Sequence, residues 1–468
     1  MWNFKQYKEK LALIDDKGRR VSYLTLYKEQ KIFAQKIDSN SLVMIICENT
    51  YECVLGYISC IQNKKPVIMV DSQIDKAQIS ILCNIYRPEY VWGKYEEIHG
   101  YSTVLHYGNY YLMSNSRSEA KKNDSIDKNI ALLLPTSGST GNRKYVCLSY
   151  KNLMSNARAI IKALNIRSDD VSPLNLPISY TYGISIVNTY LYRGASILLT
   201  ESSILDGKAW DFFEKNNFTS LSGVPRMYEN LERLKFRHKK YPSLRVMTQA
   251  GGRLNINLQK KYLEYAKLSG INFYIMYGQT EATARISCYL LNKHEDKIGS
   301  VGKAVPDLNI SIDCTKELFE AQNDNSCGEV VVEGDSVFAG YAESRKDLIS
   351  VKQRYTLHTG DIGYIDEDGY LYLVGRKTRF CKICGRRIEL DDIESVIKDE
   401  FKIVQCAAVE KDGIIYIFIV NPIEGELIKK RLFRKLNIPH FQISIHVIKK
   451  IPHNSSGKIQ YGNLLTLI

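Results

Sequence analysis

Short apolar runs rich in β-branched residues alternate along the chain with longer segments of mixed polarity. A strand that is buried on both faces reads as such a continuous run. The predicted strands lie at 42–47, 66–70, 195–200, 244–250 and 272–277. Between them, segments 151–164 and 256–268 space their apolar residues like helices that bury one face. This alternation predicts an α/β protein with at least partly parallel sheets.

The pattern changes after about residue 295, where shorter apolar runs follow one another closely. Gly, Asp and Asn separate these runs, as is typical of turns between neighbouring strands. The predicted strands of this part lie within 328–341, 369–376, 404–410 and 414–420. Segment 390–401 predicts one short helix with acidic residues in its first turn. The polar segment 95–128 is expected to be a loop-bearing connection.

Length and composition limit the class of protein. A chain of 468 residues is long for one domain, so we expect two or three. Nowhere does it approach the ~20 consecutive apolar residues that span a bilayer, and its start lacks the pattern of a secretory signal, so we expect no membrane partner. The 11 cysteines lie mostly on apolar segments, which indicates free thiols in a reducing compartment. We therefore expect the cytoplasm.

The net charge is +13, but basic and acidic residues are interspersed and form no block of like charge. We therefore expect no nucleic-acid partner. The part from Lys377 onward carries about as much basic excess as the rest of the chain combined. A solvated lysine surface explains this excess most simply, and steering of an acidic partner or a phosphorylated ligand is the alternative.

The predicted strand 130–135 leads directly into a string of small residues. These are Thr136, Ser137, Gly138, Ser139, Thr140 and Gly141, and Lys144 follows. Backbone N–H groups and hydroxyls in such a turn can form a concavity that binds phosphate. The string lacks the Gly-Lys-Ser/Thr ending of a P-loop, and alone a surface linker explains it equally well.

Three further motifs follow in order: "YIMYGQTEAT" at 274–283, the segment 357–389, and "PHNSSGKIQ" at 452–460. Together with the small-residue string they make the chain resemble the AMP-forming synthetase superfamily. That superfamily includes acyl-CoA synthetases, the adenylation domains of peptide synthetases, and luciferases. The resemblance covers nearly the whole chain. Four motifs in one order are far more specific than any one of them.

The resemblance implies a fold and a reaction. The fold would comprise a large N-terminal domain over 1–375, with αβ-layered sheets and a small β-barrel-like subdomain. A hinge at 376–378 would follow, and then a small mobile α+β domain over 379–468 that carries the catalytic lysine. In the reaction, a carboxylate attacks the α-phosphorus of ATP to give an acyl-adenylate and pyrophosphate. The acyl group then passes to the thiol of coenzyme A or of a carrier's phosphopantetheine.

The same resemblance assigns roles to individual residues. Thr136–Gly141 and Lys144 would hold the β- and γ-phosphates, Thr280 the α-phosphate, and Glu281 the Mg²⁺ ion. Asp361 would bind the ribose hydroxyls, with Arg376 beside the same sugar. Lys458 would reach both the attacking carboxylate and the α-phosphate. Tyr277 and the backbone at Gly251 and Gly252 would sandwich the adenine, and Gly278 is a further cofactor-binding candidate.

The acyl group is expected to bind at "LPISYTYGISIV", where Tyr180, Tyr182 and Gly183 are the candidate residues. Many acyl-CoA synthetases have a histidine at the position of Tyr180. The segment also lacks the aspartate that holds an α-amino group in peptide-synthetase domains. A buried ammonium without a carboxylate is unfavourable, so an α-amino acid is disfavoured as the substrate. For the second half-reaction, the resemblance places Lys382 and Gly385 at the pantetheine tunnel.

We therefore predict an ATP-dependent ligase for a small carboxylic acid. The alternative enzyme is a stand-alone adenylation domain that loads an amino or hydroxy acid onto an acyl or peptidyl carrier protein. A nucleotide-sensing scaffold without catalysis is a third hypothesis, and the presence of Thr280, Glu281, Asp361 and Lys458 speaks against it. Cys381 and Cys384 form a lone pair that cannot complete a tetrahedral zinc site.

Overall fold

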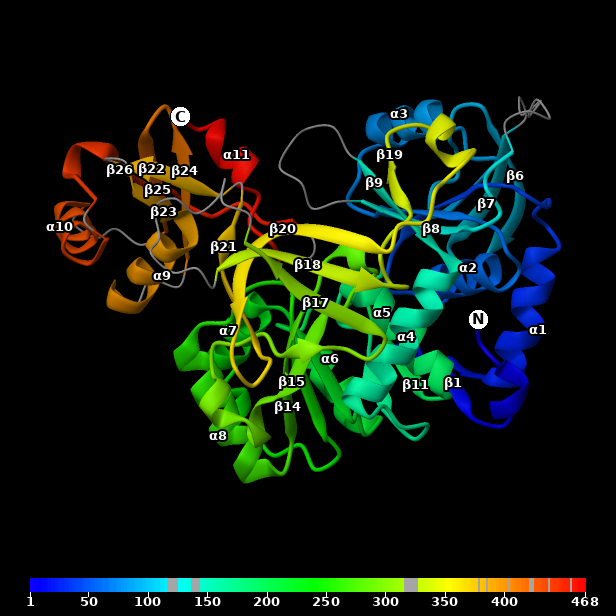
Figure 1. The fold of residues 1–468 in the computed structure, drawn as a ribbon. Helices are drawn as coiled ribbons and strands as arrows, with labels where there is room; N and C mark the ends of the chain where they lie inside the picture. The colour runs from blue at the N-terminus through cyan, green and yellow to red at the C-terminus, as the bar shows by residue number, and fades with distance from the viewer. Residues whose placement is uncertain are drawn as a thin grey trace.

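The computed structural model places the chain in a series of layered sheets and helices (Figure 1). It describes residues 1–115, 125–135, 144–314, 327–377, 379–383, 386–401, 405–420, 425–436, 438–454 and 457–468. Segments that are blue to green in Figure 1 form the larger part of the molecule, and the orange and red segments form a smaller lobe beside it.

An eight-stranded sheet occupies one side of the larger part, in the order β19-β9-β8-β4-β3-β5-β7-β6. Its centre is parallel, and antiparallel strands flank it on both sides. The strands are β3 (Val43–Cys47), β4 (Val67–Asp71), β5 (Tyr90–Gly93), β6 (Tyr101–Tyr107), β7 (Tyr110–Asn115), β8 (Ile130–Pro135), β9 (Tyr145–Ser149) and β19 (Gly340–Ala342). The buried β3 and β4 confirm the strands predicted at 42–47 and 66–70.

One sequence expectation for this sheet is wrong. The polar segment 95–128 contains the antiparallel pair β6 and β7, which extends the edge of the sheet. Strand β6 exposes most of its residues to solvent, so its sequence lacks the apolar run of a central strand. The helices near this sheet are α1 (Tyr23–Ala34), α2 (Tyr51–Gln62) and α3 (Lys76–Tyr86).

A five-stranded sheet forms the other side, in the order β12-β13-β14-β15-β16. Its strands are β12 (Ser220–Gly223), β13 (Val246–Gln249), β14 (Asn272–Tyr277), β15 (Ser287–Leu290) and β16 (Lys303–Ala304), with helices α6 (Gly207–Lys215), α7 (Pro225–Arg233) and α8 (Ile256–Ser269). Strands β12 to β14 are parallel, so Gly223, Gln249 and Tyr277 end at one edge. Ligands of open α/β sheets bind at this edge.

A four-stranded sheet and two helices link these two sheets. The sheet has the order β10-β11-β1-β2, from β1 (Leu11–Asp15), β2 (Arg20–Ser22), β10 (Val171–Pro173) and β11 (Ser196–Leu199). The helices are α4 (Tyr150–Leu164) and α5 (Thr181–Arg193). The Ser149 side chain caps α4 by accepting from the Asn152 amide, so the helix begins at the predicted place. One continuous hydrophobic core joins these elements.

A wholly antiparallel sheet follows β16, after the change of pattern at about residue 295. The sheet has the order β17-β18-β20-β21, from β17 (Leu308–Asp313), β18 (Gly328–Gly334), β20 (Thr356–Ile365) and β21 (Leu371–Arg376). In the register of β20 and β21, Asp361 lies opposite Arg376. Two candidate residues on consecutive strands are thereby brought together.

The C-terminal lobe has hydrophobic clusters of its own, one of which packs around Ile393 and Ile417. Its elements are β22 (Phe380–Ile383), β23 (Arg386–Glu389), α9 (Leu390–Phe401), β24 (Cys406–Lys411), β25 (Ile414–Ile419), α10 (Gly425–Leu436), β26 (Ile443–Val447) and α11 (Tyr461–Leu465). The layered α/β part followed by a small α+β lobe agrees with the predicted fold class. The boundaries at 375 and 379 stay a prediction.

Cysteines and apolar helices can also be described in the structure. Each cysteine in the described part of the chain is a free thiol, and most are buried. Among the helices in the described ranges, none has both the length and the apolar character needed to cross a membrane.

Candidate active site

A buried carboxylate joins the larger part to the start of the hinge. Asp361 is 4% exposed, and its two oxygens accept from the Tyr277 hydroxyl at 2.5 Å and from Arg376 Nε at 2.8 Å. The Asp361 charge raises the pKa of Arg376. Burial first, and then the same carboxylate, raises the pKa of Tyr277 well above its usual value. All three side chains are therefore fixed in position at the end of β14.

Thr280 and Glu281 lie in the short 3-10 helix Thr280–Ala282, directly after β14. The Thr280 hydroxyl lies 2.7 Å from that of Thr181, the first residue of α5. Glu281 Oε1 accepts from the Tyr341 hydroxyl at 2.9 Å, and its backbone carbonyl accepts from the Phe338 amide at 2.8 Å. These contacts orient the Glu281 carboxylate from β19 and from the segment that precedes it.

Lys458 reaches this site from the C-terminal lobe. A tight turn holds its backbone, in which the Lys458 amide donates to Asn454 Oδ1 at 2.9 Å and Gly457 has a φ of +78°. The ammonium lies 5.4 Å from the centroid of the Tyr180 ring. Burial and the neighbouring Arg376 charge lower the pKa of Lys458 to about 8, although Glu281 and Asp361 oppose this shift. The residue is thus within electrostatic reach of the whole cluster.

Glycines let backbone segments approach closely around the cluster. A Cβ on Gly251, which has a φ of +83°, would lie 2.8 Å from the Tyr180 hydroxyl oxygen. A Cβ on Gly252 would lie 3.2 Å from Pro225 Cγ. A Cβ on Gly278 would lie 1.7 Å from the Ala284 carbonyl oxygen, so only glycine fits in this turn.

The residues expected at the acyl group have different surroundings. Tyr180 precedes α5, and burial raises its pKa to about 12. The buried Tyr182 hydroxyl lies 2.7 Å from Thr248 Oγ1. Gly183 packs against the Pro177 carbonyl oxygen, which would lie 2.1 Å from an added Cβ. Gly183 is thus explained by backbone packing within the larger part.

One predicted residue, Lys144, does not join the cluster in this conformation. Lys144 is half-exposed and forms an ion pair with Glu343 at 3.0 Å. Lys382 lies in β22 opposite Arg387, and its side chain is outside the description. Thr136, Ser137, Gly138, Ser139, Thr140 and Gly141 lie outside the described residues, as do Cys384 and Gly385.

Three residues at the site escaped the sequence analysis. Thr181 and Tyr341 hold Thr280 and Glu281, and nothing in their local sequence indicates this contact. Arg285 is 3% exposed, and its guanidinium carbon lies 4.7 Å from the Tyr182 ring centroid. An arginine within the otherwise uncharged segment 282–290 was the signal available for it.

The donor set suits a magnesium nucleotide. Mg²⁺ in such sites takes one or two protein carboxylates and fills its other positions with phosphate oxygens and water. Glu281 supplies one oriented carboxylate. No cluster of three or more metal-ligating side chains occurs in the ranges that the structure describes. The metal would therefore bind together with the phosphates.

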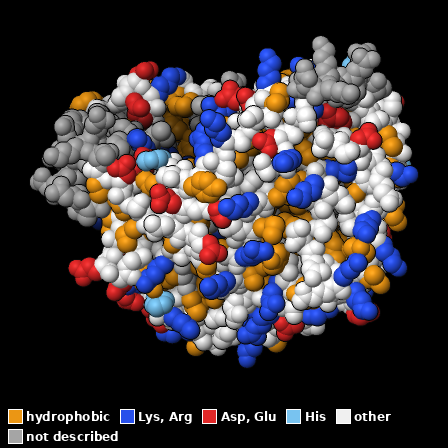
Figure 2. Space-filling model, turned by 45° about the vertical axis from the view of Figure 1, so that its right-hand side comes forward, with side chains coloured by type: hydrophobic (Ala, Val, Ile, Leu, Met, Phe, Trp, Pro, Cys, Tyr) orange, Lys and Arg blue, Asp and Glu red, His pale blue; other side chains and the backbone are white. Residues whose placement is uncertain are grey.

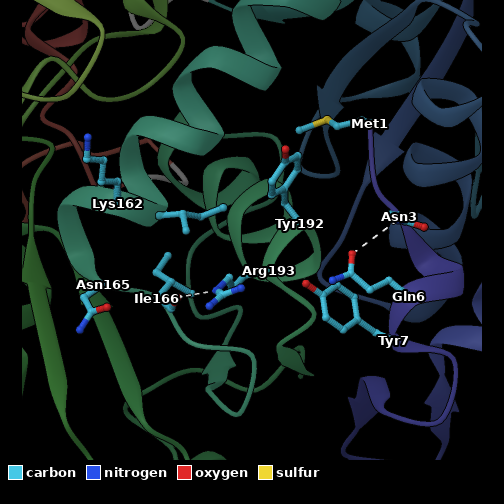
Figure 3. Close-up of a pocket in the computed structure, with 10 residues that line it drawn as sticks. Met1, Asn3, Gln6, Tyr7, Lys162, Asn165, Ile166, Tyr192 and Arg193 are labelled. Atoms are coloured by element: carbon cyan, nitrogen blue, oxygen red, sulfur yellow. Dashed lines mark hydrogen bonds between the residues drawn. The ribbon is translucent and has the colours of Figure 1, made fainter.

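Other surface features lie away from the cluster. Figure 2 shows basic side chains scattered among acidic ones on one face of the molecule. This distribution agrees with the interspersed charges of the sequence. A cavity of about 560 Å³ lies between the N-terminal segment and helices α4 and α5, and no residue predicted from the sequence lines it (Figure 3).

Residues 1–342 match the family described as AMP-binding enzyme. The chain belongs to this family. It is therefore an ATP-dependent, AMP-forming acid–thiol ligase that works through an acyl-adenylate, as the sequence predicts.

Similar proteins include the 2-succinylbenzoate–CoA ligase of Oceanobacillus iheyensis, which is 25% identical over 97% of this chain and 96% of its own length. The oxalate–CoA ligase of Arabidopsis thaliana is 29% identical over 70% of this chain and 66% of its own length. Both names describe acid–CoA ligases.

Solved structures show the same fold. The o-succinylbenzoate CoA synthetase of Bacillus subtilis with its acyl-adenylate intermediate superposes with a TM-score of 0.80 at 19% identity, over 98% of this chain and 97% of that chain. ATP-bound MatB of Rhodopseudomonas palustris gives 0.76 at 19% identity, over 99% and 98%. These likenesses confirm the predicted fold class, with a large N-terminal and a small C-terminal domain.

Proposed function

We propose that the chain joins a small carboxylic acid to coenzyme A, and that this acid resembles 2-succinylbenzoate. The observation that carries the proposal is the meeting of Lys458 with Arg376, Asp361 and Glu281 beside Tyr180. The relatives named for 2-succinylbenzoate and oxalate support it, and so does the near-complete coverage of the first of them. We place the enzyme in the cytoplasm, where ATP and coenzyme A are available.

The nucleotide would bind along the carboxyl edge of the five-stranded sheet. Asp361 would accept from the ribose hydroxyls, with Arg376 beside it. Tyr277 and the Gly251–Gly252 backbone would flank the adenine, and Gly278 would leave room in the turn. Thr136–Gly141 and Lys144 would hold the β- and γ-phosphates. In this conformation Lys144 is paired with the exposed carboxylate of Glu343. It would have to break that ion pair to bind the phosphates.

The chemical step brings two anions together, because the acid's carboxylate attacks the α-phosphorus and pyrophosphate leaves. Lys458 would contact both anions and offset their repulsion, and Thr280 would donate to the α-phosphate. Glu281 would hold Mg²⁺, which supplies further positive charge at the phosphate oxygens when it is bound. Removal of one such aimed donor costs on the order of 10²–10³ in rate.

The transfer step would follow a rotation of the C-terminal domain about a hinge at 376–378. Lys458 would then withdraw, and the β22–β23 hairpin with Lys382 and Gly385 would approach the acyl-adenylate. Such lobe movements take microseconds to milliseconds and can limit turnover. We take coenzyme A rather than a carrier protein as the acceptor, because the relatives are named CoA ligases.

The test measures acid-dependent exchange of pyrophosphate into ATP with 2-succinylbenzoate, oxalate, benzoate, acetate and an amino acid. The active acid is then supplied with either coenzyme A or a phosphopantetheine carrier. We expect exchange with 2-succinylbenzoate and release of its CoA thioester. Exchange with the amino acid and transfer only to the carrier would overturn the proposed substrate and acceptor. Tight ATP binding without exchange for any acid would overturn the proposed function as a whole.

A further inference from the structure

Arg285 is a buried cation for which the described part of the chain provides no anion. It is 3% exposed, and its Nε atom is fully buried without a hydrogen-bond partner. In the described part of the chain its guanidinium forms no hydrogen bond and no ion pair. Its aromatic contact is the Tyr182 ring, 4.7 Å from its guanidinium carbon.

Two other buried cations in the described part of the chain have hydrogen-bond partners. Arg345, which is 7% exposed, donates to Glu89 Oε1 at 2.6 Å and to the Arg87 carbonyl at 2.6 Å. Lys65, which is 6% exposed, donates to two backbone carbonyls. A buried charge without a partner is strongly unfavourable, and an aromatic face offsets only part of that penalty. Arg285 therefore differs from these structural cations.

The backbone at Arg285 is held firmly in place. Asn156 of α4 accepts from the Arg285 amide at 3.3 Å and donates to its carbonyl at 2.9 Å. The nearby Thr283 has a φ of +65°, which is uncommon for a β-branched residue. The turn thus fixes the backbone of Arg285 in advance of any ligand, and preorganised groups bind more tightly than mobile ones.

The position of Arg285 relates it to the reacting end of the acid. Lys458 lies near the Tyr180 ring and Arg285 lies against the Tyr182 ring, two residues along the start of α5. The Arg285 charge also acts on Tyr180, where it opposes the effect of burial on the pKa of that hydroxyl. The two cations are thus associated with neighbouring tyrosines of the expected acyl site.

We propose that Arg285 is the specificity-determining residue that binds a second carboxylate of the acid substrate. The inference rests on the proposed ligase function and adds the residue that selects a dicarboxylate over a monocarboxylate. The reacting carboxylate lies at Lys458, and the second one pairs with the Arg285 guanidinium, which offers a fork of donors matched to a carboxylate. Binding of the acid then supplies the missing anion.

The test compares kcat/KM in pyrophosphate exchange for 2-succinylbenzoate and for benzoylpropionate, the same skeleton without the ring carboxylate. In the wild type we expect the diacid to be preferred by about 100-fold or more, the usual scale for a desolvated charge pair. Arg285→Met should lose this preference by lowering diacid activity alone, and Arg285→Lys should keep part of it. Arg193→Met, at the exposed end of α5, is the control and should leave both activities unchanged.

A stability measurement separates this role from a structural one. Arg285→Met removes an unpaired buried charge, so its Tm without ligand should equal or exceed that of the wild type. The diacid should raise the Tm of the wild type and not that of the variant.

Three outcomes would count against these expectations. A lower ligand-free Tm of Arg285→Met, together with an equal loss of exchange activity for both acids, would overturn the proposal. Exchange in the wild type with monocarboxylates only would overturn it and leave the ligase function standing. Absence of exchange with every acid would overturn the ligase function. In that case, a Tm increase by the diacid in the wild type but not in Arg285→Met would still support carboxylate binding by Arg285, and its absence would overturn it.

Discussion

At the scale of single residues, the site is governed by how charges are balanced around Lys458. Burial and Arg376 favour the neutral amine, whereas Glu281 and Asp361 favour the ammonium. The outcome is a pKa of about 8, so the charged form predominates at neutral pH. Lys458 therefore carries its charge in the free enzyme at neutral pH. It is also already partly desolvated before the carboxylate and the phosphates bind.

The first prediction concerns this ionisation. Because the ammonium is the active form, kcat/KM for adenylation should fall as the pH rises through about 8. Lys458→Arg, which stays charged, should lack this fall, although its absolute rate is lower. The measurement is pyrophosphate exchange from about pH 6 to about pH 10, at subsaturating acid, which spans the titration.

Lys458→Ala provides the control for that prediction. It should lower adenylate formation by about 10²-fold or more, yet consume a supplied acyl-adenylate with coenzyme A at nearly the wild-type rate. An equal loss in the two half-reactions would contradict the role of Lys458. A fall above the pKa of about 8 that persists unchanged in Lys458→Arg would show that another group titrates.

At the scale of elements, the turn between β14 and β15 is the part that positions the chemistry. Within this turn, Thr280 contacts Thr181 of α5 and Glu281 contacts Tyr341 of β19. Arg285 contacts the ring of Tyr182, also in α5. The turn closes on itself at Gly278, where the Ala284 carbonyl takes the space of a side chain. The conformation of this one segment therefore aims three functional groups.

The second prediction follows from that close approach. In Gly278→Ala the new methyl group would meet the Ala284 carbonyl, which is backbone and cannot rotate away. We expect a loss of about 2–4 kcal/mol in the free energy of unfolding, measured by urea denaturation. Gly207→Ala, at the start of α6 with open space around its Cβ, is the matched control. It should be neutral or stabilising by up to about 1 kcal/mol. Equal stabilities of the two variants would refute the packing argument.

At the scale of the whole molecule, the two lobes meet through small polar and turn contacts. Asn255 Nδ2 of the larger part donates to Asp399 Oδ1 of α9 at 2.5 Å. The turn at Gly457 approaches Val224 and Arg226 at the start of α7. Contacts of this kind are compatible with relative movement of domains. They hold Lys458 at the site in this conformation.

The third prediction tests whether the contact at Asp399 favours the adenylating arrangement. Asp399→Ala removes it and leaves the Asn255 cap of α8 intact. Because an exposed pair contributes little, we expect adenylation to slow by about 2–5-fold while transfer from supplied acyl-adenylate is unchanged. Glu426→Ala, in a pair within α10, should affect neither step. Equal slowing of both half-reactions by Asp399→Ala would argue against the prediction.

The sequence by itself determined the elements whose apolar pattern is strong. Strands 42–47 and 272–277 and helix 390–401 lie where the pattern predicts. A fully buried strand requires a continuous apolar run, and a helix with one buried face requires apolar residues at helical spacing. The ordered motifs also determined the family and the reaction. The edge strand β6 was not predicted, because it is largely exposed and lacks an apolar run.

Only the tertiary structure decided which residues meet. Asp361 and Arg376 pair through strand register, and Lys458 reaches Tyr180 through the placement of the C-terminal lobe. Arg285 is surrounded by residues of α4 and α5, which are distant in sequence. That its guanidinium has no hydrogen-bond partner among the described residues therefore depends on the packed fold. A linear pattern encodes burial and local conformation, whereas pairing of charges depends on chain segments that come together only when the core forms.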